Sequence, residues 1–276
     1  QERGEQTSAG FDLSHTAYYL GALVVLAALA WFTSQAWMQY GGAVLAGMVS
    51  AYGVGFWRFG DHLWQQEEFR VAGGLLVVLA AWTVPLVLFG LQHEFGLWAG
   101  WEGNSPRDIT HYGEFLQLNW FTLEIGLLTA ATLLLRRYSF PFLLFPLVAA
   151  GWFFGMDAVE LVAQTLGGEV PFGEHRITTL VYGLLVLGTG FYWDQRTRED
   201  YSFWLYLFGL LLAWTAFSAG GIDRVVYLLL NLGLMGTAVL LRRRTIMVFG
   251  SLGVFSYLTW LTSELFAEFM LFPIVL

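Results

Sequence analysis

The chain has 276 residues, of which 57% are hydrophobic and only 12% charged, whereas apolar residues make up about 45–50% of a soluble domain even when glycine is counted. The formal net charge is −8 and all 13 basic residues are arginines, so nothing predicts a nucleic-acid partner. The absence of cysteine and lysine excludes disulfides, iron–sulfur clusters, cysteine zinc sites, Schiff-base cofactors and Walker A loops.

Long apolar runs predict an all-α, polytopic transmembrane bundle. A helix needs about 20 apolar residues to cross a bilayer, and nine runs approach that length. In chain order they cover residues 14–37, 40–57, 71–91, 115–135, 140–163, 177–193, 202–219, 224–241 and 246–266. Residues 271–276 open a tenth run that is too short to span. We therefore expect an N-terminal tail at 1–12, a remnant of a longer segment, and a transmembrane domain at 13–276.

Arginine placement predicts the orientation, because cytoplasmic loops carry an excess of basic residues. With nine crossings, ten arginines fall on the side of the N-terminus and three on the other side. The ten are Arg3, Arg58, Arg70, Arg136, Arg137, Arg196, Arg198, Arg242, Arg243 and Arg244. This split predicts a cytoplasmic N-terminus and an acidic outer face.

The sequence also contains an apparent internal repeat. Leu-Leu-Arg-Arg at 134–137 aligns with Leu-Arg-Arg-Arg at 241–244, which sets Glu124 on Asn231. Gly-Val-Gly-Phe at 53–56 resembles Gly-Thr-Gly-Phe at 188–191 at a larger offset. The second to fifth predicted helices would then be a parallel copy of the sixth to ninth. The alternative is chance similarity among apolar helices that end in arginine.

Several strings resemble a family of uncharacterised bacterial multi-pass membrane proteins, a domain of unknown function. They are Tyr-Tyr-Leu-Gly at 18–21, Arg-Arg-Tyr-Ser-Phe-Pro-Phe at 136–142 with Met156-Asp157, Asp-Gln-Arg-Thr-Arg-Glu-Asp-Tyr-Ser-Phe-Trp at 194–204 and its continuation to Gly209, and Val-Phe-Gly at 248–250. The resemblance covers nearly the whole chain. It implies a soluble segment before the first helix and further chain after Leu-Phe-Pro at 271–273. It brings no activity, substrate or catalytic residue.

Glu124 is the most conspicuous single residue, because an acid in the middle of a predicted transmembrane helix is costly and is seldom left without a partner. One interpretation is proton or cation handling, with Asn231 as its counterpart in the repeat. The other is a protonated or hydrogen-bonded residue that holds helices together.

Four acids lie near the outer ends of two predicted helices. Asp157 and Glu160 are three residues apart, and Glu264 and Glu268 are four apart, so each pair shares a helix face. If the repeat holds, the four could form an acidic mouth that recruits a cation. The alternative is an ordinary solvated surface at helix ends.

Two further groups of residues are candidates for sites. Histidines and an aspartate near the outer loops, His93, Asp108, His111 and His175, would suit a divalent metal, although their spacing matches no known signature. Charged residues before the seventh helix form either an ion-pair cluster or a partner-docking surface: Asp194, Arg196, Arg198, Glu199 and Asp200.

The sequence favours an integral membrane protein that transports protons, cations or small solutes through an acidic outer mouth. Few polar residues are available to line a path, which supports a second hypothesis, a non-catalytic accessory or scaffold subunit that packs against other membrane subunits. An extracytoplasmic metal-binding enzyme is the third. No nucleophile–base pair or cofactor fingerprint is visible, so we expect no enzyme, no cofactor beyond that metal, and the lipid bilayer as the main partner.

Overall fold

The computed structural model describes residues 13–97, 118–168, 175–194, 201–218, 223–241 and 243–275, and every regular element in these ranges is helical. The α-helices are α1 (Leu13–Trp64), α2 (Arg70–Glu94), α3 (Leu118–Tyr138), α4 (Leu144–Thr165), α5 (His175–Asp194), α6 (Tyr201–Ser218), α7 (Arg224–Leu241) and α8 (Arg244–Val275). Short 3-10 helices, η1 (Glu67–Phe69) and η3 (Pro141–Leu143), precede α2 and α4.

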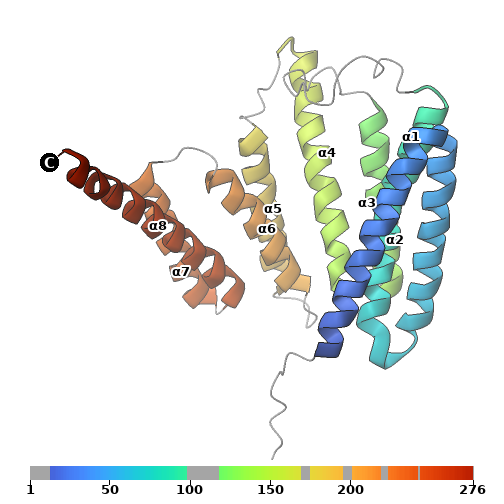
Figure 1. Cartoon of the computed structure of the whole chain (residues 1–276), viewed down its shortest axis with the longest axis horizontal. Helices are drawn as coiled ribbons and strands as arrows, with labels where there is room; N and C mark the ends of the chain where they lie inside the picture. Colours follow the sequence, from blue (N-terminus) through green and yellow to red (C-terminus); the bar gives the residue numbers. More distant parts are fainter. Residues whose placement is uncertain are drawn as a thin grey trace, which may run out of the picture.

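Successive helical segments run in alternating directions, and the pairs α1–α2, α2–α3, α3–α4, α5–α6 and α7–α8 pack side by side (Figure 1). We call the end of the bundle that holds the α1–α2, α3–α4, α5–α6 and α7–α8 connections the arginine end, because Arg58, Arg70, Arg137 and Arg243 lie there. The opposite end, where α2, α4 and α6 finish, is the acidic end. The α7–α8 hairpin contacts the rest of the bundle mainly through α6.

The helix α1 is broken at Gly41, whose backbone adopts φ 77° and ψ −162°. A positive φ of this kind is unfavourable for residues with a Cβ, so glycine suits the break. The second segment starts with its backbone N–H groups uncapped by the helix itself, and the carboxylate of Glu94 accepts a hydrogen bond from Ala43 N at 3.0 Å. The sequence predicted that one helix ends at residue 37 and the next begins at residue 40, and in the structure the chain reverses direction close by, at Gly41.

Five helices in the described ranges are long and apolar enough to cross a membrane: Glu67–Glu94, Pro141–Ala163, Tyr201–Ser218, Arg224–Leu241 and Arg244–Glu264. Large apolar side chains on their outward faces are exposed, among them Leu86, Val162 and Leu240. A water-soluble surface would not carry so many such side chains, whereas lipid tails solvate them. The all-helical fold and its membrane character agree with the sequence.

The last apolar run does not begin a tenth element. Residues 271–275 continue α8, which extends without interruption from Arg244 to Val275. Pro273 lies within this helix and, in the described chain, does not end it. A proline in the last turn removes only one backbone hydrogen bond, which a helix end tolerates better than a helix interior.

Glycines let several helix pairs approach at backbone distance. A Cβ on Gly73 of α2 would lie 2.6 Å from Trp64 N and 2.8 Å from Gly60 O. A Cβ on Gly183 of α5 would lie 2.7 Å from Ala213 N of α6. Small residues at helix contacts are the usual basis of packing in membranes, where burial of apolar surface gives little net driving force. The α1–α2 and α5–α6 pairs are therefore the most closely packed hairpins of the bundle.

Candidate functional site

Four ionisable side chains are buried together near the acidic end: Glu124 of α3, Asp157 and Glu160 of α4, and His175, the first residue of α5. Their exposed fractions are 7%, 5%, 1% and 2%. Ionisable groups are almost never buried to this degree unless they pair with one another or carry protons. We call these four residues the buried cluster.

The outermost pair of the buried cluster joins α4 to α5. His175 Nε2 lies 3.7 Å from Glu160 Oε2, and neither side chain reaches the protein surface. This separation is longer than a hydrogen bond, but a protonated imidazole at this position would form an ion pair with the carboxylate. This pair is the part of the cluster nearest to the start of α5.

The deeper pair joins α3 to α4. The carboxyl groups of Glu124 and Asp157 lie against each other. Two ionised carboxylates have only acceptor atoms, so a hydrogen bond between them needs a bound proton. Glu124 Oε2 has no hydrogen-bond partner among the described residues. The pair therefore offers an acceptor to a proton or to a hydrogen-bond donor.

The cluster lies nearer to the acidic end than to the arginine end. Glu124 lies 13 residues, or about 20 Å along α3, from Arg137 at the arginine end. Asp157 and Glu160 lie in the last two to three turns of α4.

Below the cluster, toward the arginine end, the buried side chains of α3 and α4 are apolar. Leu127, Ala131 and Ala150 are at most 4% exposed, and Ala81 of α2 packs with Leu127 and Ala150. We call these four residues the apolar layer. It separates the buried cluster from the polar groups at the arginine end.

Hydrogen bonds between α4 and α5 fix the helix that carries His175. Trp152 Nε1 donates to Thr179 Oγ1 at 3.0 Å, and Thr179 Oγ1 donates to His175 O at 3.0 Å. One helical turn further on, Tyr182 OH donates to Val148 O at 3.1 Å. These contacts lock the first turns of α5 against α4, so they hold the His175 ring over Glu160.

The counterpart proposed for Glu124 lies elsewhere and is structural in character. Asn231 of α7 is fully buried, accepts a hydrogen bond from Trp214 Nε1 at 3.2 Å and donates to Tyr227 O at 2.8 Å. It also packs so closely on Gly253 of α8 that a Cβ there would overlap its side chain. Asn231 thus ties α6, α7 and α8 together.

Of the four acids of the expected mouth, the structure describes the side chains of Asp157, Glu160 and Glu264, and Glu264 lies on a different part of the bundle. Asp157 and Glu160 point into the buried cluster, whereas Glu264 is exposed on α8, which packs against α6 and α7. The side chain of Glu268 lies outside the described side chains. The structure therefore groups Asp157 and Glu160 with Glu124 and His175 instead.

The predicted metal ligands are divided between described and undescribed parts. His93 packs edge-on against Trp37, with ring centroids 4.5 Å apart, and His175 belongs to the buried cluster. Asp108 and His111 lie outside the described residues. Within the described ranges, no three His, Asp or Glu side chains are arranged to hold a metal ion.

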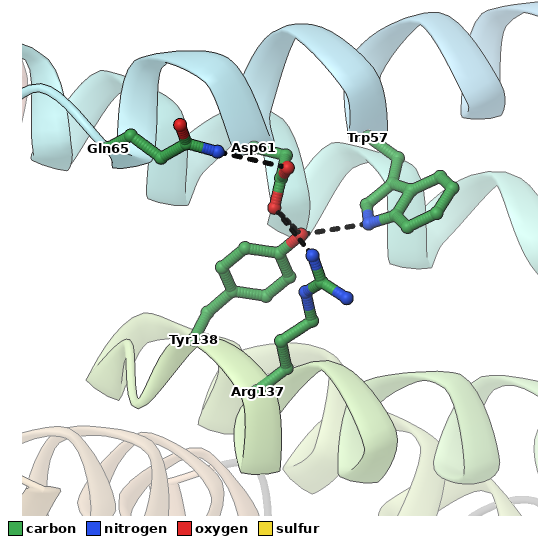
Figure 2. Close-up of polar contacts among 5 residues, drawn as sticks. All are labelled: Trp57, Asp61, Gln65, Arg137 and Tyr138. Carbon is green, nitrogen blue, oxygen red and sulfur yellow. Dashed lines mark hydrogen bonds and ion pairs between the residues drawn. The ribbon is translucent and has the colours of Figure 1, made fainter.

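A second polar network lies at the arginine end, between α1 and α3 (Figure 2). Tyr138 OH donates to Asp61 Oδ1 at 2.8 Å and accepts from Trp57 Nε1 at 2.9 Å. Arg137 Nη2 lies 3.0 Å from the same carboxylate oxygen, and Gln65 Nε2 donates to the other oxygen at 3.4 Å. Tyr138, Arg137 and Gln65 thus contact the Asp61 carboxylate, and Trp57 binds the Tyr138 hydroxyl.

This network lowers the pKa of Asp61 below its ordinary value, first through the hydrogen bond from Tyr138 and then through that from Arg137. A carboxyl with a depressed folded-state pKa stabilises the fold above its unfolded pKa of about 4. That contribution is lost as the pH falls through the folded-state pKa. The Asp61 network therefore stabilises the contact between α1 and α3 at neutral pH, and this stabilisation is lost in acid.

Replacing Tyr138 by phenylalanine should remove this stabilisation of the α1–α3 contact. The variant loses the donor to Asp61 and leaves the Trp57 indole N–H without its acceptor, at a cost of about 1–3 kcal/mol. Thermal unfolding of the purified protein should show a lower midpoint at neutral pH, with a difference that shrinks below about pH 4. Tyr40→Phe, at an exposed position, is the control and should leave the midpoint unchanged. Equal midpoints for Tyr138→Phe and the parent chain would contradict this role.

A second ion pair at the arginine end joins the end of α5 to the connection between α7 and α8. Arg243 Nε donates to Asp194 Oδ2 at 3.1 Å, and Arg243 Nη2 contacts Asp194 Oδ1. The guanidinium also lies 5.9 Å from the ring centre of buried Tyr206. Of the predicted docking residues, Asp194 is thus engaged within the bundle, and Arg196, Arg198, Glu199 and Asp200 lie outside the described residues.

Two features of these sites were missed from the sequence. The Glu124–Asp157 contact had a usable signal, since both residues lie 13 or 14 positions from the connection between α3 and α4. Residues equally distant from the turn of an antiparallel hairpin lie at the same depth. The Tyr138–Asp61–Trp57 network had no such signal, because it depends on how α1, α2 and α3 are rotated about their axes.

No known protein-family model, no curated protein and no solved structure matches the chain.

Proposed function

We propose that the chain is an integral protein of the bacterial inner membrane that takes up protons or other cations at the buried cluster, from the extracytoplasmic side, and transports them. The observation that carries this proposal is the burial of Glu124, Asp157, Glu160 and His175 at one end of a lipid-facing bundle. Buried ionisable groups in membrane segments are expensive and usually serve ion or proton pathways.

The proposed topology has nine crossings, with the arginine end in the cytoplasm. The reversal at Gly41 splits α1 into two segments, and α2 to α8 supply seven more. Helix direction alternates, so the connections that carry Arg58, Arg70, Arg137 and Arg243 meet on one side (Figure 1). The positive-inside rule assigns that side to the cytoplasm. The buried cluster then faces the outer compartment.

The proposed duplication relates the segment after Gly41 and α2–α4 to α5–α8. It is supported by the two ion pairs at the arginine end. Each joins an aspartate at the end of the first helix of a unit, Asp61 or Asp194, to an arginine at the end of the third, Arg137 or Arg243. The offsets, 133 and 106 residues, lie within two residues of those in the sequence alignment. Under this relation Glu124 of the first unit corresponds to Asn231 of the second, so only the first unit carries an acid at this place.

A flux assay tests the proposed transport. The purified chain in liposomes should dissipate an imposed proton or cation gradient, and Glu124→Gln should reduce that flux at least tenfold, because the amide cannot carry the charge. Glu264→Gln is the matched control, since it removes an acid that is exposed on α8. Absence of flux in the parent chain, or equal flux in Glu124→Gln, would contradict the proposal.

The apolar layer favours a second candidate function, an accessory subunit. Ala81, Leu127, Ala131 and Ala150 leave no polar side chains to continue the path from Glu124 toward the arginine end. In that case the chain would bind other membrane subunits and show no flux by itself. Mild detergent extraction from the native membrane should then yield a larger complex of constant composition, and extraction as a single species would contradict it.

A further inference from the structure

We propose that the species bound by the buried cluster is the proton, and that the four side chains form a relay in which His175 and Glu160 are the entry pair and Glu124 and Asp157 the storage pair. This inference rests on the proposed function only for the direction of movement. The binding of protons follows from the geometry of the two pairs.

The arrangement of the storage pair favours a shared proton. The carboxyl groups of Glu124 and Asp157 lie against each other, and a hydrogen bond between two carboxyls forms only when one of them is protonated. Both side chains are more than nine-tenths buried, so no solvent shell stabilises a double negative charge. The free acceptor, Glu124 Oε2, can take a second proton or accept a hydrogen bond from a water molecule that delivers it.

The entry pair supplies an exchangeable proton at a useful position. His175 opens α5 at the acidic end, and its ring nitrogen faces Glu160 at 3.7 Å. An imidazole can both accept and donate a proton through its ring nitrogens, so His175 can pass a proton from the acidic end to Glu160. The proton moves from imidazolium Nε2 to the Glu160 carboxylate, which leaves neutral imidazole and a carboxylic acid.

The two pairs are linked along α4. Asp157 and Glu160 are one helical turn apart on the same face, so the proton that leaves Glu160 has its acceptor in the adjacent turn. Glu160 returns to a carboxylate and Asp157 becomes the acid that donates to Glu124. Charge and proton number are conserved at each step, and no other reactant is needed.

Within the described ranges, the charged groups near His175 are mostly the acids of the cluster. Packed against it from α4 are Asp157 and Glu160, and Glu124 of α3 contacts Asp157. The next residue, Arg176, is exposed at the start of α5. The described acidic-end half of α6, residues 210–218, contributes no titratable side chain.

Infrared spectroscopy of the purified full chain in lipid nanodiscs tests the relay without any transport measurement. A protonated carboxyl has a C=O stretch that a carboxylate lacks, and we expect this band in the parent chain at neutral pH. Glu124→Gln and Asp157→Asn should each abolish it, because the remaining acid ionises once its partner is an amide. Glu264→Gln should keep it, and thermal unfolding establishes that each variant is folded.

A second arm distinguishes the proton from a metal cation. Sodium, magnesium and zinc ions, each added at constant pH, should leave the band unchanged, whereas a cation that binds between the carboxyls would expel the proton and erase it. His175→Gln should slow the exchange of this proton with D2O at least tenfold, since the entry pair is lost. A missing band in the parent chain, erasure by a cation, or unaltered exchange in His175→Gln would overturn the relay. A band without flux supports proton binding and contradicts transport.

Discussion

Replacing Gly73 by leucine is expected to prevent the chain from folding into the bundle. Even a single Cβ at this position would lie 2.6 Å from Trp64 N and 2.8 Å from Gly60 O, closer than real Cβ contacts allow. The obstacle is backbone, so no change of rotamer can relieve it, and the segment of α1 after Gly41 would have to move away from α2. That movement would also separate Gly42 from Gly90 at the other end of the same hairpin.

The measurement is the yield of monodisperse protein after detergent extraction, followed by its thermal midpoint. Overpacking of a well-packed contact already costs about 1–3 kcal/mol in soluble cores, and a backbone clash exceeds that range. Gly47→Leu is the matched control, because a Cβ at Gly47 meets nothing within 4 Å and the residue is exposed. Normal yield and midpoint for Gly73→Leu would show that α1 and α2 are not in the contact described.

Replacing Asn231 by aspartate should destabilise the contact among α6, α7 and α8 strongly at neutral pH. The new side chain has the same shape, but the site is fully buried and its only described side-chain donor is Trp214 Nε1. The substitution also removes the Asn231 amide group that donates to Tyr227 O. An acid at the centre of a membrane helix costs about 3 kcal/mol on insertion scales, and the thermal midpoint should fall accordingly.

Acid should relieve this cost, because a protonated aspartate is neutral and regains a donor for Tyr227 O. The midpoint of Asn231→Asp should therefore approach that of the parent chain as the pH is lowered toward 4. Asn231→Leu is the control: it loses the same hydrogen bonds without adding charge, so its penalty should not vary with pH. A pH-independent penalty in Asn231→Asp would mean that position 231 is hydrated or has a cationic neighbour.

Helix boundaries were the most predictable part of this fold, because apolar length and arginine placement mark them directly. The sequence expected helices at 71–91 and 224–241, and the structure gives Arg70–Glu94 and Arg224–Leu241. The prediction that a tenth helix begins at residue 271 was wrong, since residues 271–275 continue α8. An apolar stretch after charged Glu264 and Glu268 resembles a new segment, yet Pro273 lies in the last turn of α8 and does not end the helix.

The site was predictable only in part. Glu124, Asp157, Glu160 and His175 were each candidates from the sequence, but they were assigned to three separate sites. Their convergence depends on the α3–α4 hairpin and on the loop that brings the start of α5 back to the end of α4. Asp61 and Tyr138 were not candidates at all, because each looks like an ordinary residue at a helix end until Trp57 and Arg137 are placed beside them.

The shallow position of Glu124 has an electrical consequence. A charge that crosses the whole bilayer gains or loses about 2.3 kcal/mol for each 100 mV of membrane potential. Glu124 lies about 20 Å along α3 from Arg137, which leaves about a third of a hydrocarbon core of about 30 Å between it and the acidic end. Under the proposed topology, a proton that reaches it from outside crosses roughly a third of the field, worth about 0.7 kcal/mol. The occupancy of the storage pair would then change about threefold per 100 mV. The remaining two thirds of the voltage drop fall below Glu124, along the stretch of α3 that contains Leu127 and Ala131.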